Sequence, residues 1–142
     1  MSRTKKAMSM QLHRIRLERA KTADYPEGDP NDGYEFVAPL DHEGRLDAEA
    51  WPEAAQLCTL RRFVPGAEDV HGELIYRGNG EWAFSYRPGD ADDEVIYRLR
   101  EHWLRVGEYV SVTEQDGVVR PFRVASTEAL HIVPKAKSGG RR

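Results

Sequence analysis

The stretch GEYVSVTEQDGVVRPFRVAS, residues 107–126, has the pattern of a β-hairpin. Two apolar runs flank Asp116-Gly117, and polar residues alternate within each run. Asp-Gly favours a tight hairpin turn, because glycine adopts positive φ freely and aspartate tolerates it better than most residues. We therefore predict a surface turn over residues 114–120. In the first strand Val110 and Val112 share one face, and the opposite face carries Tyr109, Ser111 and Thr113.

The second half of this hairpin is less regular. Val118, Phe122 and Val124 share a face that Arg120 interrupts. Pro121 has no N–H to donate, so this strand is predicted to lie at a sheet edge or to contain a bulge. The loop offers no nucleophile, general base or ligand cluster, so we predict that the hairpin is first a structural wall. Its polar face would line a pocket only if the barrel were open there.

Further strands are predicted on both sides of the hairpin. Seven short β-runs follow Cys58, separated by turn signals such as Gly78-Asn79-Gly80. Upstream, residues 11–19 and 34–40 also have strand patterns, and residues 25–33 have the composition of a loop. The segment LDAEAWPEAAQLC, 46–58, is the best helix candidate, with Asp47 as a possible N-cap and Pro52 in the first turn.

These elements predict a mainly β fold, α+β in class terms. It would be a small antiparallel β-barrel or a compact sandwich of about six to eight strands with one main helix. Residues 10–134 are predicted to form a single globular domain. Residues 1–9 and 135–142 are basic and lack an apolar pattern, so disordered tails are expected there.

Composition restricts the classes of function. The tails carry seven Lys and Arg and no acid, so the remaining 14 face all 24 Asp and Glu, and residues 10–134 have a formal charge of −10. An acidic body makes nucleic acid an unlikely partner. No apolar run is long enough for a membrane helix, and the N-terminus lacks the apolar region of a signal peptide. With Cys58 as the one cysteine, we expect a cytoplasmic protein.

Three phrases, GYEFVAPL, DAEAW and GEYVSV…DG…FRV, resemble those of a small family of uncharacterised bacterial proteins. The resemblance spans roughly residues 10–126 and implies no function. The last phrase also resembles, in its order of a glycine, an acidic residue, a β-run, a turn and a second β-run, the flavin-binding barrels of reductases and PUA-like nucleic-acid barrels. The chain departs from both, because Arg123-Val124-Ala125-Ser126 does not match the Arg-x-Tyr-Ser strand of the flavin barrels and the body is acidic rather than basic as in the PUA-like modules.

Motifs for catalysis or metal binding are missing from the sequence. The five histidines show no zinc-site spacing, and no Gly-x-Ser-x-Gly or phosphate-binding loop occurs. The acidic stretches 25–33 and 90–94 fit solvated turns better than calcium loops. Cys58 has the context of a buried small hydrophobe. We therefore predict no catalytic residue, no metal and no cofactor.

The strongest concentration of binding-type residues is in the middle strands. Trp82, Phe84 and Tyr86 share one face of their strand, a pattern that also suits a hydrophobic core. The alternative is an aromatic pocket whose rim of Arg and His binds a carboxylate or phosphate. The candidate residues for it are Arg62, His71, Tyr76, Arg77, Trp82, Tyr86, Arg87 and Arg98.

Two functional hypotheses follow. The missing catalytic motifs and the acidic body favour the first, a non-catalytic binding or protein-interaction module with an unknown protein partner. The alternative is a small-ligand-binding β-barrel, or an enzyme built on one, with an aromatic pocket for a small anionic ligand.

Overall fold

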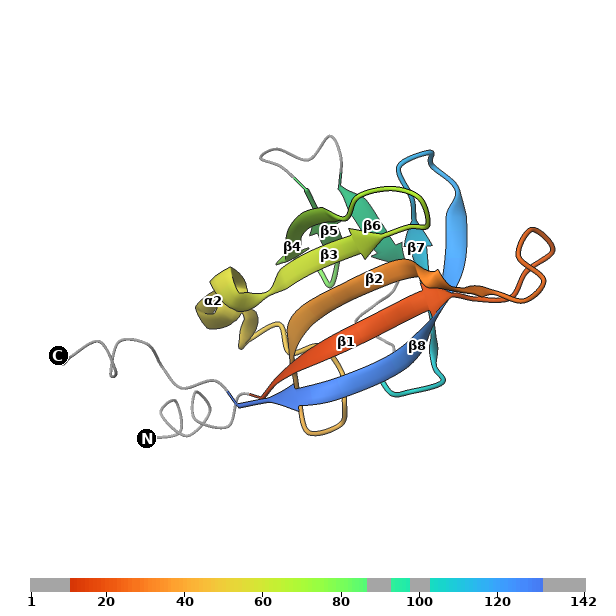
Figure 1. The fold of residues 1–142 in the computed structure, drawn as a ribbon. Helices are drawn as coiled ribbons and strands as arrows, with labels where there is room; N and C mark the ends of the chain where they lie inside the picture. Colours follow the sequence, from red (N-terminus) through yellow and green to blue (C-terminus); the bar gives the residue numbers. More distant parts are fainter. Residues whose placement is uncertain (1–10, 87–92, 98–102, 132–142) are drawn as a thin grey trace, which may run out of the picture.

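The computed structural model describes residues 11–86, 93–97 and 103–131. In these residues, antiparallel strands follow one another in chain order and close into an eight-stranded barrel (Figure 1). β1 completes the closure by pairing with β8, with Leu17 opposite Val124. The strands are β1 (Gln11–Arg19), β2 (Asp29–Leu40), β3 (Thr59–Phe63), β4 (Val70–Tyr76), β5 (Trp82–Ser85), β6 (Glu94–Tyr97), β7 (Tyr109–Thr113) and β8 (Val119–Leu130).

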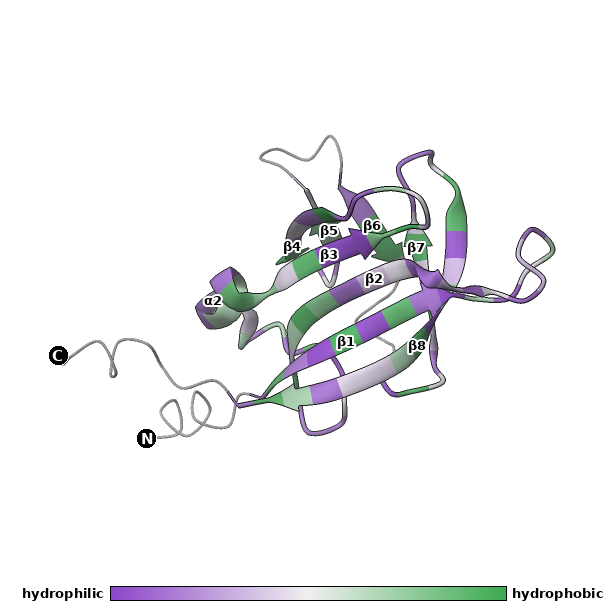
Figure 2. Ribbon diagram, in the orientation of Figure 1, coloured by the Kyte–Doolittle hydropathy of each residue, from purple (hydrophilic) through white to green (hydrophobic). Residues whose placement is uncertain are grey.

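The predicted mainly β fold is confirmed, and the barrel replaces the sandwich alternative. The period-two pattern of the sequence sets which side chains face inward. In β1, Ile15 and Leu17 are fully buried, while Arg16 and Glu18 between and beyond them stay partly exposed. Figure 2 shows this alternation of apolar and polar residues along β1.

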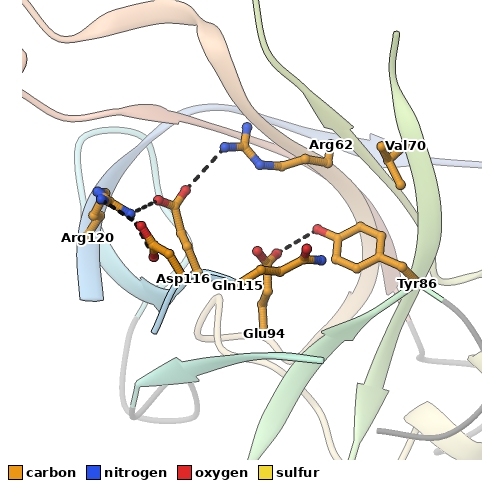
Figure 3. A pocket seen from close by; sticks show the side chains of 8 residues that line it. Arg62, Val70, Tyr86, Glu94, Gln115, Asp116 and Arg120 are labelled. Atoms are coloured by element: carbon orange, nitrogen blue, oxygen red, sulfur yellow. Dashed lines mark hydrogen bonds and ion pairs between the residues drawn. The ribbon is translucent and has the colours of Figure 1, made fainter. Parts of the chain in front are cut away.

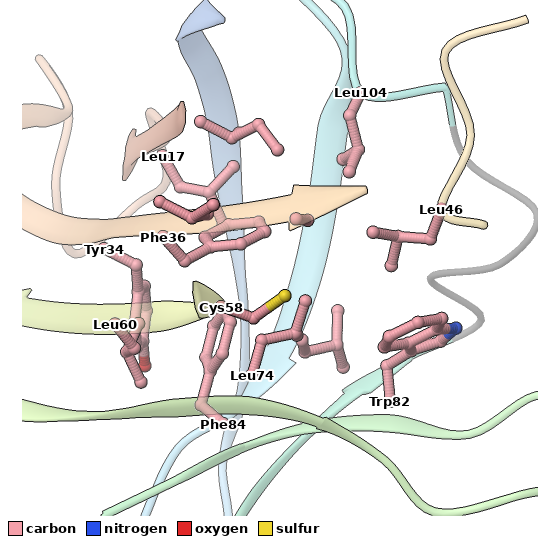
Figure 4. Packing of buried hydrophobic residues seen from close by; sticks show 14 of the residues in the cluster. Leu17, Tyr34, Phe36, Leu46, Cys58, Leu60, Leu74, Trp82, Phe84 and Leu104 are labelled. Carbon is pink, nitrogen blue, oxygen red and sulfur yellow. The ribbon is translucent and has the colours of Figure 1, made fainter. Parts of the chain in front are cut away.

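The interior of the barrel is filled by side chains along most of its length (Figure 4). The ring of Phe84 lies 4.6 Å from that of Tyr34 and 5.2 Å from that of Phe36, measured between centroids. An eight-stranded barrel is just wide enough for its own side chains to fill. The prediction that Trp82 and Phe84 belong to the core is therefore confirmed, since both are at most 1% exposed.

The helix predicted over residues 46–58 is much shorter than expected. It comprises one turn, α2 (Trp51–Ala54), and a 3-10 turn, η1 (Ala55–Leu57). Leu46 instead bridges to Leu40. The carboxylate of Asp47 accepts the backbone N–H groups of Glu49 and Ala50 and so forms a turn rather than a helix cap. Pro52 lies in the first turn, as predicted.

Two strand boundaries also differ from the prediction. Residues 29–33 begin β2 rather than belonging to a loop, and residues 119–125 and 129–130 belong to one continuous strand. Continuity of β8 depends on a bulge opposite Arg16 and Leu17, which absorbs one residue and keeps the apolar face inward.

Pro121 does not lie at a sheet edge, because the closed barrel has none. It lies one residue beyond the last β1–β8 pair, Arg19 and Phe122, where its carbonyl accepts the N–H of Ala20. A missing N–H costs little at the end of a ladder.

The predicted hairpin between β7 and β8 is confirmed. Glu114 N–H donates to Val118 O at 3.0 Å, and Gly117 N–H donates to Glu114 O at 2.8 Å. Gly117 has φ of +83°, whereas no other residue of this turn has positive φ. The turn is thus a type I turn completed by a glycine bulge, not the primed turn that Asp-Gly suggested.

Candidate functional site

Polar side chains gather at one end of the barrel, which we call the mouth. Odd-numbered strands end there and even-numbered strands begin there. The residues that define the mouth are Arg19, Arg62, Tyr86, Glu94, Glu114 and Arg120. A cavity of about 570 Å³ opens at the mouth and is lined by Arg62, Val70, Tyr86, Glu94, Glu114, Gln115, Asp116 and Arg120 (Figure 3). Ligand pockets have volumes of about 300–1,000 Å³.

Glu114 is the centre of an ion-pair network at the mouth. Its carboxylate lies 3.1 Å from Arg19 Nη2, 3.2 Å from Arg62 Nη2 and 2.6 Å from Arg120 Nη1. Asp32 forms the second bridge, 2.8 Å from Arg19 Nε and 2.7 Å from Arg62 Nη1. This network joins β1, β2, β3 and the β7–β8 hairpin, so it fixes the shape of the cavity wall.

Arg62 is held from several sides. Its Nη1 also donates to the carbonyl oxygens of Gly33 and Phe63, at 3.0 Å and 2.8 Å. Its guanidinium lies over the ring of Tyr34, 4.7 Å from the centroid. Arg62 is therefore a structural arginine of the wall, with most of its donors already used.

Glu94 lies at the floor of the cavity and is 4% exposed. Its Oε1 accepts two hydrogen bonds, from Tyr34 Oη at 2.9 Å and from Tyr86 Oη at 2.7 Å. Figure 3 shows the Tyr86 contact. Burial raises the pKa of Glu94 above its ordinary value, although the tyrosine hydrogen bonds and the charge of Arg62 oppose this effect.

The two tyrosines remain protonated donors. Burial raises the pKa of both Tyr34 and Tyr86, and the charge of Glu94 acts in the same direction. A buried carboxyl group therefore faces the cavity with its orientation fixed by two phenols, a device typical of functional sites.

The structure brings together two of the eight residues predicted as ligand-binding. Arg62 and Tyr86 both line the cavity.

The other candidates within the described residues lie elsewhere. His71 is exposed and lines a shallow hollow on the outside of the barrel with Arg61. Tyr76 and Trp82 pack together at the other end, with ring centroids 4.8 Å apart. Arg77 pairs with Glu81 at 3.1 Å and Asp93 at 3.7 Å. Arg87 and Arg98 lie outside the described residues.

Sequence reasoning missed most of the cavity lining, including the hairpin. The hairpin was expected to be first a wall, lining a pocket only where the barrel is open, and its turn and the first residues of β8 contribute Glu114, Gln115, Asp116 and Arg120 to the lining. Two signals were present in the sequence. Arg120 breaks an apolar face, and Glu94 takes the inward phase of the run Glu94-Val95-Ile96.

A second hollow of about 480 Å³ lies where β1 begins, lined by Gln11, His13, Leu40, residues 41–44 and Arg105. Its polar groups come mainly from one exposed loop, so it holds fewer fixed groups than the mouth. Within the described residues no group of three or more His, Cys, Asp or Glu is arranged to hold a metal ion. The helices among these residues are too short and too polar to cross a membrane.

No protein-family model matches this chain, and no curated protein or solved structure is significantly similar to it. The geometry of the mouth is therefore the guide to the function of this protein.

Proposed function

We propose that this protein is a small-ligand-binding barrel that takes a polar organic molecule into the mouth cavity. The observation that carries this proposal is Glu94: a buried carboxyl group, positioned by two tyrosine hydroxyls, at the floor of a cavity of about 570 Å³. Taking a carboxyl group out of water is costly, and a barrel stabilised only by its core would gain more from an apolar residue there.

The lining supports binding rather than covalent catalysis. Among its described residues there is no Cys, Ser, Thr, His or Lys, and the carboxylates of Glu114 and Asp116, which could also act as nucleophiles, are held in ion pairs with Arg120. Cys58 is fully buried in the core, and burial raises its pKa to about 12, which disfavours the reactive thiolate. The proposal therefore assigns recognition to the mouth, with no reaction.

The protein-interaction hypothesis has one observation in its favour. Val118 and Val119, where the hairpin enters β8, are 46% and 55% exposed. They would form a small apolar contact surface beside the mouth. A partner bound there would protect these residues without filling the cavity, so the two functions are separable by mutation.

Two expectations from the sequence remain part of the proposal. Residues 10–134 would form one globular domain, with residues 1–9 and 135–142 as disordered basic tails. A cytoplasmic location fits a chain with one cysteine, which is buried in the core.

A blocking substitution tests the proposal. Val70 lines the cavity and is 51% exposed, so Val70→Trp should fill part of the cavity without disturbing the core. Val106→Trp is the matched control, because Val106 is 59% exposed and does not line the cavity. Metabolites that raise the melting temperature of the parent protein should be screened first.

We expect Val70→Trp to abolish the stabilisation caused by those metabolites and Val106→Trp to retain it. Equal loss in both variants, or retention in both, would contradict binding at the mouth.

A further inference from the structure

The arginines of the mouth have no uncompensated charge. Arg19, Arg62 and Arg120 face the three carboxylates of Asp32, Glu114 and Asp116 at distances of 2.6–3.2 Å. Their formal charges cancel. An anion bound here would have to compete with carboxylates that are already held at hydrogen-bond distance.

Competition with these internal pairs would be expensive for an anion. Asp32 is 5% exposed, and the side chain of Glu114 is 10% exposed, so the ion pairs of both carboxylates are largely shielded from water. Displacing one carboxylate would leave a charge buried without a partner, and such a charge costs several kcal/mol. This argues against the small anionic ligand expected from the sequence.

Glu94 is different from the other carboxylates of the mouth. In the part of the chain that the structure describes, no Lys, Arg or His forms an ion pair with it. Its two close partners, Tyr34 and Tyr86, donate hydrogen bonds but carry no charge. When Glu94 is ionised, the mouth has one negative charge that the described side chains leave uncompensated.

We propose that the ligand of the mouth is a cation, an organic ammonium or amidinium whose N–H groups pair with the carboxylate of Glu94. This inference rests on the proposed function and names its ligand class. The hydroxyl oxygen of Tyr86 has lone pairs to accept a second N–H, and Val70 gives the cavity an apolar side for the rest of the molecule.

The charge of the whole barrel acts in the same direction. The formal charge of −10 over residues 10–134 attracts cations and repels anions at long range. A metal ion fits less well than an organic cation, because the described residues provide no group of three metal ligands.

Four test ligands with one skeleton separate the ligand classes: benzylamine, benzamidine, benzyl alcohol and benzoate. Their affinities for the full chain should be measured by isothermal titration calorimetry or NMR. We expect both cations to bind about tenfold or more tightly than the alcohol or the acid, the size of one charge-assisted hydrogen bond.

The variants assign the cation to Glu94. In Glu94→Gln the amide oxygen still accepts from both tyrosines, so the fold should persist while cation affinity falls about tenfold. Glu128→Gln is the matched control, because it removes the same charge from a side chain that is 68% exposed and that pairs with Arg14 on the outside of the barrel. It should change affinity by less than about twofold.

The pH dependence of the parent protein provides a check that needs no variant. The groups that face Glu94 are Tyr34, Tyr86, Arg62 and Glu114. The tyrosines and the arginine keep their charge states over the acidic range. Because the pKa of Glu94 is raised and a cation requires its ionised form, benzamidine should bind more tightly as the pH rises through that pKa and more weakly as the pH falls through it.

The outcomes distinguish the two proposals. Benzoate or benzyl alcohol binding more tightly than both cations, blocked by Val70→Trp, would overturn the cation inference and leave the binding function standing. Cation binding that Glu94→Gln does not weaken would also overturn the inference. Binding of none of the four at millimolar concentration would overturn both.

Discussion

The two ends of this barrel are covered by different kinds of side chain. At the end opposite the mouth, α2 packs against the barrel and Trp51 meets Trp82 edge-on, with centroids 6.4 Å apart. We call this the helix end. Leu46 and Leu104 complete its apolar cover (Figure 4). The mouth instead buries Arg19, Asp32 and Glu94, the three polar residues that are most buried among those described.

The comparison shows that one end of the barrel provides stability and the other provides a site of fixed geometry. Apolar burial at the helix end stabilises the fold without directional requirements. The charged mouth gains little net stability, because the attraction between ions offsets the cost of removing them from water. The same eight strands thus hold a core at one end and a site of fixed geometry at the other.

The largest effect is expected from the helix end. Trp82→Ala should lower the free energy of unfolding by about 3–5 kcal/mol, because the ring is 1% exposed and packs on both Trp51 and Tyr76. Trp103→Ala is the control, since its ring is 38% exposed and contacts the guanidinium groups of Arg45 and Arg105. It should cost about 1 kcal/mol or less.

Denaturant unfolding of both variants measures this contrast. A Trp82→Ala protein as stable as the parent would show that the helix end does not dominate the stability of the barrel.

Glu114→Gln should have the next largest effect. It leaves Arg19, Arg62 and Arg120 with one carboxylate fewer, and breaking a buried pair costs about 2–4 kcal/mol. Glu128→Gln should cost less than about 0.5 kcal/mol, because its pair with Arg14 is exposed. Thermal and denaturant unfolding give both values. A Glu114→Gln protein more stable than the parent would show that the ion-pair network destabilises the fold.

A smaller effect is expected at the turn beside the mouth. Gly117→Val should destabilise the protein by about 1–2 kcal/mol, because φ of +83° strains a β-branched residue. An added Cβ would contact nothing within 4 Å, so backbone strain is the whole effect. Gly117→Asn should recover most of the loss, since asparagine tolerates this conformation. Equal stabilities of the Val and Asn variants would rule out strain as the cause.

The sequence predicted the barrel well and the mouth poorly, for one physical reason. The period-two alternation in β1, β5 and β7 is local, so it identifies inward faces such as Ile15 and Leu17 without knowledge of the fold. The helix over residues 46–58 was overestimated because its alanines favour a helix, while Asp47 satisfies nearby N–H groups in a turn instead.

The mouth depends on register, which a sequence does not display. Glu94 meets Tyr34 across 60 positions, and Arg62 meets Glu114 across 52. Arg62 and Tyr86 were among the candidates because arginines near aromatic strands are a recognisable pattern of ligand-binding pockets in any sequence. Glu94 was missed because a single acidic residue at the start of a strand is usually exposed. Only the closed barrel shows that this one is buried.

The most direct test of the mouth is the titration of the Glu94 side-chain carboxyl carbon by NMR, assigned by its loss in Glu94→Gln and followed with and without benzamidine. We predict that Glu94 titrates above the ordinary range of glutamate in the free protein, because burial disfavours its charged form. Benzamidine should lower this pKa by stabilising the carboxylate. A Glu94 that titrates in the ordinary range, with a pKa unchanged by saturating benzamidine, would contradict its role as the ligand-binding carboxyl group of the mouth.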